Sequence, residues 1–187
     1  MNLKFSYRCW PDKDGHKVAY VQAEDGDYLP WIYRDMHLSY PKFFKMDDMT
    51  KVGFLAVERL MLDFEGSLDP KTTGVVFFSA EASLPTDRQF EETIKDDDDF
   101  FPSPSIFVYT LPNILCGEVC IRHGFQGESG LYVIYDLDKE VVMNICRDML
   151  GNNSAVILGI VDEDKGKFWA RAEVITKDYL SKNSENV

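Results

Sequence analysis

The chain has 187 residues, 45% hydrophobic and 13% aromatic, which is enough apolar material for one domain with a sizeable core and excludes disorder for most of the chain. Its 32 acidic and 20 basic residues give a net charge of −12, which excludes nucleic acid and anionic membranes as favoured partners. No stretch approaches the ~20 apolar residues of a membrane span, the first residues lack a signal-peptide core, and the four cysteines form no dense disulfide pattern, so we predict a cytoplasmic protein with reduced thiols.

After a weakly patterned start at residues 1–40, runs of strand length alternate with helical patterns. Continuous apolar runs such as 74–78 are typical of strands covered on both faces, and apolar residues at steps of three or four indicate helices. The predicted elements, in chain order, are a strand at 17–21, a helix at 49–64, a strand at 74–78, helices at 87–94 and 112–123, a strand at 130–135, a helix at 139–150, and strands at 155–161 and 167–175.

Turn and capping residues set the limits of these elements. The predicted N-caps are Asp47 or Asp48, Thr86 and Asp138, and the predicted helix ends are Gly66, Gly124 and Gly151. Turns are predicted at 12–15 and 24–27, and the segment 102–104 is expected to break any helix. The strand at 167–175 is expected to be more exposed than the buried strands before it, and residues 179–187 are expected to form a frayed tail. Strands alternating with helices predict an α/β fold with a mainly parallel sheet covered by helices.

Three segments resemble β-ketoacyl synthases, a family with the thiolase-like fold. They are Lys-Phe-Phe-Lys-Met-Asp at 42–47, the segment 103–127, and Ala-Val-Ile-Leu-Gly-Ile-Val-Asp at 155–162. The middle segment is the specific one, because its spacing matches over more than 20 residues at Pro104, Phe107, Pro112, Asn113, Gly117, Gly124 and Gly127. The resemblance implies a thiolase-like N-terminal half over residues 41–178 and leaves residues 1–40 unassigned.

The chain departs from this family at the catalytic positions. The family spacing from Gly127 leads to Asp136 where the family has a nucleophilic cysteine, and a carboxylate is a poor acyl acceptor. The family's catalytic histidines come from a C-terminal half, whereas His16, His37 and His123 lie in other segments. The resemblance therefore predicts a pseudoenzyme that acts without a cofactor or metal.

In the family, the strand before the nucleophile pairs with its copy across a two-fold axis. The matching strand here is predicted as an interface, and it consists of Gly130, Leu131, Tyr132, Val133, Ile134 and Tyr135. The leading hypothesis is an accessory subunit of fatty acid, polyketide or polyene synthesis, a homodimer or a chain-length-factor-like partner of a complete ketosynthase. Two alternatives are an enzyme acting on an acyl thioester with Asp136 or His123 as base, and an acyl-ligand binding module. An acyl carrier protein is a possible partner, but it is acidic and needs a basic patch, and the sequence shows no dense Lys/Arg cluster.

The remaining candidate sites have simpler explanations. Cys116 and Cys120 lack the second pair of a zinc site, and Cys146 lies on the apolar stripe of its helix. The acidic run 96–99 lacks the interleaved glycine and distal glutamate of a calcium loop, which favours a solvated loop. Gly124, Gly127 and Gly130 precede a strand and not a helix, which favours turn geometry over a phosphate loop.

Overall fold

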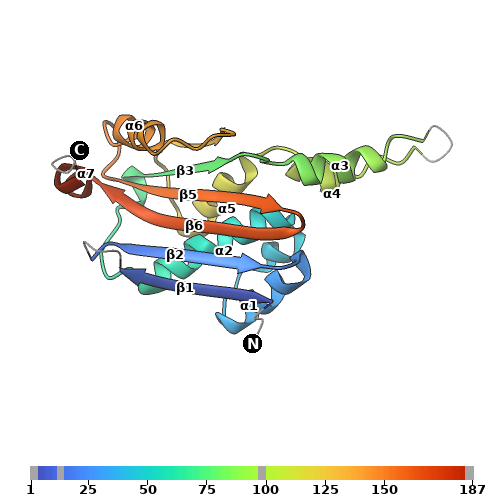
Figure 1. Ribbon diagram of the computed structural model, residues 1–187, viewed down its shortest axis with the longest axis horizontal. Helices are drawn as coiled ribbons and strands as arrows, with labels where there is room; N and C mark the ends of the chain where they lie inside the picture. Colours follow the sequence, from blue (N-terminus) through green and yellow to red (C-terminus); the bar gives the residue numbers. More distant parts are fainter. Residues whose placement is uncertain (1–3, 12–14, 97–99, 184–187) are drawn as a thin grey trace.

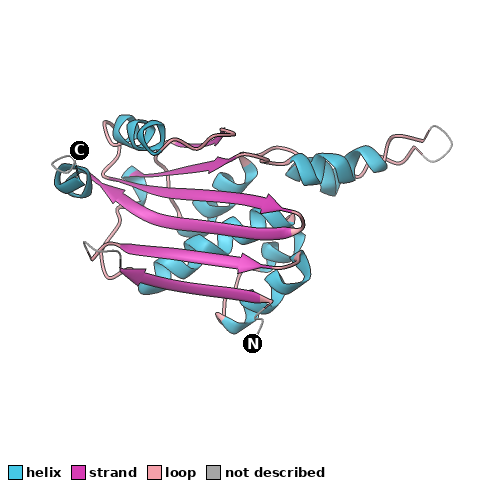
Figure 2. Cartoon of the chain, in the orientation of Figure 1, coloured by secondary structure: helices cyan, strands magenta, loops and turns pink. Residues whose placement is uncertain are grey.

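The protein is described by a computed structural model that covers residues 4–11, 15–96 and 100–183. Within these residues the chain forms a six-stranded sheet in the order β1-β2-β6-β5-β3-β4, with helices on its two faces (Figures 1 and 2). The strands are β1 Phe5–Pro11, β2 Lys17–Ala23, β3 Thr73–Ser79, β4 Ser129–Val133, β5 Ala155–Asp164 and β6 Lys167–Thr176. The helices are α1 Leu29–Asp35, α2 Asp48–Asp63, α3 Leu84–Glu92, α4 Pro104–Tyr109, α5 Ile114–His123, α6 Lys139–Met149 and α7 Lys177–Asn183, with short 3₁₀ turns at Gly26–Tyr28, Pro41–Lys45 and Pro70–Thr72.

The α/β class is confirmed, but the sheet is mixed and not mainly parallel. Only β3 pairs in parallel with its neighbours β4 and β5, whereas β1–β2, β2–β6 and β5–β6 are antiparallel. The reason is the short connection between β5 and β6, since a parallel crossover needs a dozen or more residues. Lys165 and Gly166 have φ values of 52° and 84° there, which suits a two-residue hairpin turn.

The main core lies between one face of the sheet and the helices α1, α2 and α5, which Figure 1 shows behind the strands. As predicted, Asp47 caps α2, with its Oδ1 accepting the Thr50 N–H at 3.0 Å, although the helix ends at Asp63 before Gly66. On the second face, α6 and α7 cover part of β3, β5 and β6 through a smaller cluster that includes Cys146. No helix lies over the outer part of this face, on β1, β2 and the adjoining half of β6, in the described chain (Figure 2).

Several predicted elements differ from the structure. β6, which was predicted to be a more exposed strand, is central in the sheet, with Ala170, Ala172 and Val174 buried. It is more exposed than β3 and β5, as predicted, but less exposed than the edge strand β4. The Pro102-Ser103-Pro104 segment does not exclude a helix, because Pro104 begins α4, where a missing N–H costs nothing. The helix predicted at 87–94 is α3, which begins at Leu84 after Ser83; Thr86 instead donates its hydroxyl to Asp47 Oδ2 at 2.6 Å.

Other segments were assigned weakly or not at all from the sequence. Residues 5–11 and 29–35 form β1 and α1, and residues 177–183 form α7. Part of the predicted turn at 12–15, residues 97–99 of the acidic run and residues 184–187 of the predicted tail lie outside the described residues. Among the described residues, no helix is both long enough and apolar enough to cross a bilayer.

A helical arm, which we define as the described residues 84–96 and 100–109 and which includes α3 and α4, projects from the end of the sheet beyond β3 (Figure 1). Phe90 of α3 packs against Phe107 of α4, with 5.4 Å between ring centroids. Other large apolar side chains of the arm face solvent: Phe100 is 60% exposed and Phe101 is 78% exposed. The arm therefore presents aromatic surface that the rest of the described chain does not cover.

Candidate functional site

β4 is an edge strand of the sheet. It pairs with β3 on one side, and no described strand pairs with its other side. Its exposed side chains are apolar or aromatic, since Tyr132 is 40%, Val133 is 60% and the following Tyr135 is 85% exposed. An unpaired edge with exposed apolar side chains is a template for another strand. The predicted interface strand thus lies where it could pair with a second chain.

Asn113 already occupies part of this free edge. Because Ile134 N–H donates to Ser79 O of β3 and successive N–H groups of a strand alternate in direction, the N–H groups of Leu131 and Val133 point away from β3. The Leu131 N–H donates to Asn113 Oδ1 at 2.9 Å. The Val133 N–H thus also points outward on this edge, and its own side chain is 60% exposed.

Two glycines of the segment 103–127, which resembles the ketosynthases, determine the path of the chain from α5 to β4. Gly124 has a φ of 72° and ends α5, as predicted, with its N–H donating to Cys120 O. At Gly127 a Cβ atom would lie 2.1 Å from Asn153 Oδ1 and 2.5 Å from Thr73 O. Only glycine therefore lets the chain pass the start of β3 and deliver β4 to the edge.

Asp136 and His123 lie at opposite ends of β4. Asp136 follows the strand in an exposed bend, two residues before Asp138, which caps α6 as predicted by accepting Glu140 N–H at 2.7 Å. His123 precedes the strand at the end of α5. A five-residue strand spans roughly 13–17 Å, so these two side chains do not form one acid–base site.

His123 belongs to an ionic cluster with Glu58 and Arg122. The Glu58 side chain is only 4% exposed; its Oε1 lies 2.8 Å from His123 Nε2, and its Oε2 accepts from Arg122 Nη2 at 3.0 Å. Burial alone would raise the pKa of Glu58, but the adjacent His123 and Arg122 side chains outweigh it and hold that pKa below its ordinary value. Arg122 Nη1 also donates to Ser39 O at 3.1 Å. The cluster ties α5 to α2, which is a structural role.

The other two histidines lie elsewhere. His16 Nε2 is 3.2 Å from Glu173 Oε2 and its ring stacks on Tyr179, with 4.1 Å between centroids. His37 is an exposed residue with a φ of 53°. Within residues 4–11, 15–96 and 100–183, no three His, Cys, Asp or Glu side chains are arranged to hold a metal ion.

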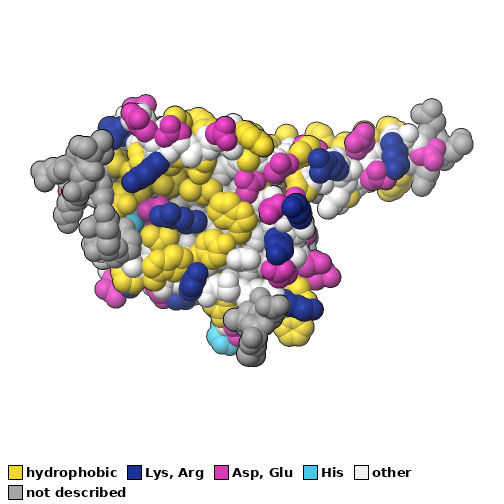
Figure 3. Space-filling view, viewed as in Figure 1, with side chains coloured by type: hydrophobic (Ala, Val, Ile, Leu, Met, Phe, Trp, Pro, Cys, Tyr) yellow, Lys and Arg dark blue, Asp and Glu magenta, His cyan; other side chains and the backbone are white. Residues whose placement is uncertain are grey.

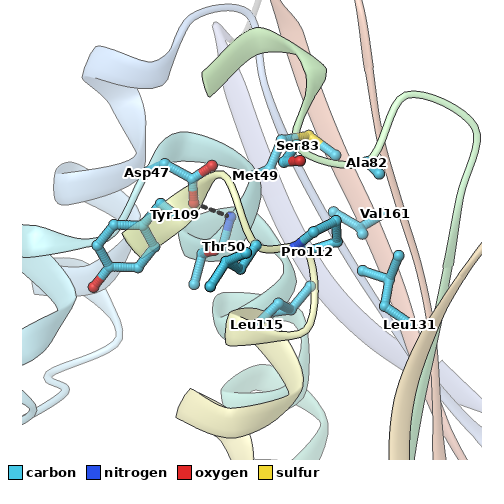
Figure 4. A pocket seen from close by; sticks show the side chains of 11 residues that line it. Asp47, Met49, Thr50, Ala82, Ser83, Tyr109, Pro112, Leu115, Leu131 and Val161 are labelled. Atoms are coloured by element: carbon cyan, nitrogen blue, oxygen red, sulfur yellow. Dashed lines mark hydrogen bonds between the residues drawn. The ribbon is translucent and has the colours of Figure 1, made fainter. Parts of the chain in front are cut away.

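A small cavity lies beneath the start of α5, beside β4 (Figure 4). Pro112 and Tyr109 line it together with Leu131 of β4, and Asp47 faces it from the start of α2. Burial raises the pKa of Asp47, whose two oxygens accept from Thr50 and Thr86. The cavity volume is about 10 Å³. That is room for about one water molecule, so this cavity does not hold an acyl chain.

The four thiols are expected to react slowly in the folded protein. Burial raises the pKa of Cys116 and of Cys146 to about 12, and it also raises the pKa of Cys9 and Cys120. The thiolate is the reactive form. At about pH 8 we therefore expect a thiol-directed reagent such as 5,5′-dithiobis(2-nitrobenzoate) to label less than one thiol per chain within minutes, and all four after unfolding in guanidinium. Fast labelling of one native cysteine would mean that this chain holds an activated thiol after all.

No protein-family model matches the sequence, and no curated protein matches it. Solved structures do match. The ishigamide ketosynthase/chain length factor is 18% identical, with a TM-score of 0.64, and the match covers 71% of this chain and 44% of that chain. The chain has the thiolase-like fold of the ketosynthases.

Two further structures have the same fold. In the ketosynthase (ApeO) in complex with its chain length factor (ApeC) from Xenorhabdus doucetiae, a chain 10% identical matches with a TM-score of 0.61, over 94% of this chain and 79% of that one. AntDE:AntF, a type II PKS acyl-carrier protein in complex with its ketosynthase, matches at 12% identity and a TM-score of 0.59, over 80% of this chain and 52% of the matched chain. The chain thus spans about half the length of two of these three matches.

Proposed function

We propose that this chain is a non-catalytic accessory subunit of a ketosynthase system, in fatty acid, polyketide or polyene synthesis. It pairs through β4 with a complete ketosynthase, as a chain-length-factor-like partner, or with a second copy of itself. The observation that carries the proposal is the free edge of β4 with its exposed Tyr132 and Val133, in a fold whose solved relatives include ketosynthase/chain length factor proteins. The cytoplasmic location stays a prediction from the sequence.

The helical arm supports the same proposal from an independent observation. Its helices have nine and six residues, and isolated helices shorter than ~12–15 residues are marginal in water. Phe101 and Phe107, which are 78% and 50% exposed, carry apolar surface that a partner would bury. We infer that the arm lies against the partner subunit that pairs with β4.

The position of Asp136 supports the non-catalytic part of the proposal. Its carboxylate is exposed, whereas a general base on a thioester needs a substrate held beside it in a pocket. The ionic cluster of Glu58, Arg122 and His123 accounts for His123 in structural terms. We also propose an acyl carrier protein as a second possible partner of this chain.

The test is co-expression of the tagged chain with the complete ketosynthase of the same genome, followed by co-purification and sedimentation. We expect a stable pair of chains, either mixed or identical. Val133→Pro removes the edge N–H, and proline is tolerated on edge strands, so this variant is expected to remain folded and to weaken pairing at least about tenfold. Phe101→Asp is expected to do the same through the arm.

Matched controls separate pairing from folding. Val133→Thr keeps both the N–H and the β-branched shape, and Leu62→Asp places a charge at an exposed apolar side chain of α2, 55% exposed, outside β4 and the arm. Both control variants are expected to pair like the wild type. A wild-type chain that sediments as a monomer and recovers no ketosynthase contradicts the proposal.

A further inference from the structure

The helical arm is joined to the rest of the chain at its base, where the chain leaves β3 and later returns to α5. In the view of Figure 3 the arm stands clear of the body along most of its length. Among the described residues of α3 and α4, only Tyr109 packs against the main core, and none belongs to the smaller cluster. Apolar packing of these helices on the body is therefore slight, and the direction of the arm depends on polar contacts at its base.

The connection that leaves β3 is folded around the Asp162 carboxylate. Asp162 lies on β5; its Oδ2 accepts the Ala80 N–H at 3.0 Å, and its Oδ1 accepts the Glu81 N–H at 3.1 Å. Oδ1 also accepts from the Ser79 hydroxyl at 3.3 Å, and Ser79 Oγ accepts the Ala82 N–H at 2.7 Å. Successive N–H groups that converge on an anion bind it well, and charge-assisted hydrogen bonds are roughly twice as strong as neutral ones. One side chain of β5 thus holds the three consecutive residues 79–81.

Ala82 has a backbone conformation that is held by its surroundings. Its φ is 50°, in the left-handed region that residues with a Cβ atom avoid. Such a conformation persists only where neighbouring contacts over-determine it, and it is typical of clamps and switches. Ala82 is buried, and α3 begins two residues later at Leu84. The bend at Ala82 therefore sets the direction in which the arm leaves the sheet.

A second set of contacts holds the base of the arm from α2. Thr86 is 3% exposed, and its hydroxyl donates to Asp47 Oδ2 at 2.6 Å, while Asp47 Oδ1 caps α2. The Ser83 hydroxyl donates to Thr110 O at 2.9 Å, which joins the segments that enter and leave the arm. Figure 4 shows Ser83 on the connection from β3 and Asp47 at the start of α2. Carboxylates from two elements of the body, β5 and α2, therefore hold the base.

We propose that Asp162 and Asp47 are positioning residues that hold the helical arm in one direction before a partner binds, so that the arm meets the partner subunit already ordered. The inference rests on the proposed function, because it explains how the arm is prepared for the partner that pairs with β4. An arm that must be ordered on binding lowers the affinity, since the apparent Kd is the intrinsic Kd divided by the fraction of competent molecules. A fixed arm keeps this fraction near one.

The first test measures the direction of the arm in the isolated full chain. Spin labels at Glu91→Cys on α3 and Glu140→Cys on α6, two exposed positions, report the distance between arm and body by double electron–electron resonance. The chain without the added cysteines is the labelling blank. We expect one narrow distance distribution for the chain that carries no further substitution.

Two variants release the base of the arm in different places. Asp162→Asn turns an amide NH2 group toward one of the two backbone N–H groups that the carboxylate accepts. Thr86→Val removes the hydroxyl at nearly the same shape and leaves Asp47 to cap α2. Each is expected to widen the distance distribution at least about twofold.

Asp164→Asn is the matched control. Asp164 is an exposed residue two positions after Asp162 on β5, so its side chain lies on the same face of the sheet. The substitution removes the same charge and leaves the hydrogen bonds to Ala80 and Glu81 intact, so the distribution is expected to stay narrow. Circular dichroism and urea unfolding of every variant establish that the body remains folded.

The second test links the direction of the arm to the partner. Pairing with the complete ketosynthase, or with a second copy of this chain, is measured by sedimentation for the same variants. It is expected to weaken at least about threefold for Asp162→Asn and for Thr86→Val, and to stay unchanged for Asp164→Asn. The loss of affinity should match the fraction of molecules whose distance leaves the wild-type range, and a purely structural role of Asp162 does not require this agreement.

Four results would overturn the inference: a broad distribution in the wild type, equal broadening by Asp164→Asn, no broadening by Asp162→Asn and Thr86→Val, and broadening without any loss of pairing. The distance measurement needs no partner. It therefore decides whether the two carboxylates fix the arm even if the wild type pairs with no other chain, an outcome that contradicts the proposed function and not the fixing of the arm.

Discussion

Replacing Glu58 by alanine is expected to lower the free energy of unfolding by about 3 kcal/mol, because removing one partner of a buried ion pair leaves the other charges uncompensated. The Glu58 carboxylate is 4% exposed and is held by Arg122 and His123. Arg122 is 29% exposed and can turn part of its guanidinium to water, which keeps the expected loss at the lower end of the range for such pairs. Urea unfolding followed by circular dichroism measures the change.

The matched control is Glu92→Ala. Glu92 also pairs with a basic residue, Lys95, but both side chains are more than half exposed, so this substitution is expected to change the stability by less than about 1 kcal/mol. The pH dependence gives a second readout. Because the folded-state pKa of Glu58 lies below its ordinary value, its contribution is present above that ordinary value and is lost as the pH falls through the folded-state pKa. The stability difference between wild type and Glu58→Ala should therefore shrink in acid, and a difference that grows would contradict this account.

Replacing Gly127 by alanine is expected to destabilise the fold by about 3 kcal/mol, at the upper end of the usual cost of overpacking. The added Cβ would lie 2.5 Å from Thr73 O and 2.6 Å from Thr73 C, which are backbone atoms that cannot turn aside. The Gly127 N–H also donates to Thr73 O at 3.1 Å, so the connection to β4 cannot move away without losing this bond.

Gly130→Ala is the control for this substitution, three residues further along the same segment. A Cβ at Gly130 meets nothing within 4 Å, so the free energy of unfolding of this variant is expected to lie within about 0.5 kcal/mol of the wild-type value. Thermal and urea unfolding of the two variants measure the difference. Equal stabilities would mean that the close approach of Gly127 to β3 does not exist in solution.

The elements that the sequence predicted well share strong local signals. The α2 stripe from Met49 to Leu60, the buried run of β3 and the capped α6 each follow from their own residues. β1 and the burial of β6 were harder to predict because their local signals are weak. In both strands, residues such as Arg8 and Arg171 alternate with small or half-buried ones. Such a pattern is typical of a strand with one buried and one exposed face. The burial of β6 also depends on β2, which lies far away along the chain.

At the candidate site, too, the features with a local sequence signal could be predicted and the others could not. The edge position of β4 followed from a resemblance extending over 103–127 and from the apolar character of 130–135. The roles of Asn113 and Gly127 at that edge required coordinates, because each acts on a residue outside its own local segment. The contacts of Tyr20 with Trp10 and Trp169 could not be predicted either, since the three residues come from separate strands.

The strand order has a consequence for synthesis of the chain. β1 and β2 are made first, but β2 joins the sheet only through β6, which lies some 150 residues later. A lone two-stranded hairpin is marginally stable in water. The hairpin of β1 and β2 therefore gains its neighbouring strand only after β6 has been synthesised, and before that it can pack only against helices such as α2. Until then Tyr20 lacks the Trp169 ring on which it stacks in the folded sheet, so we expect β1 and β2 to be a segment that a chaperone protects during synthesis.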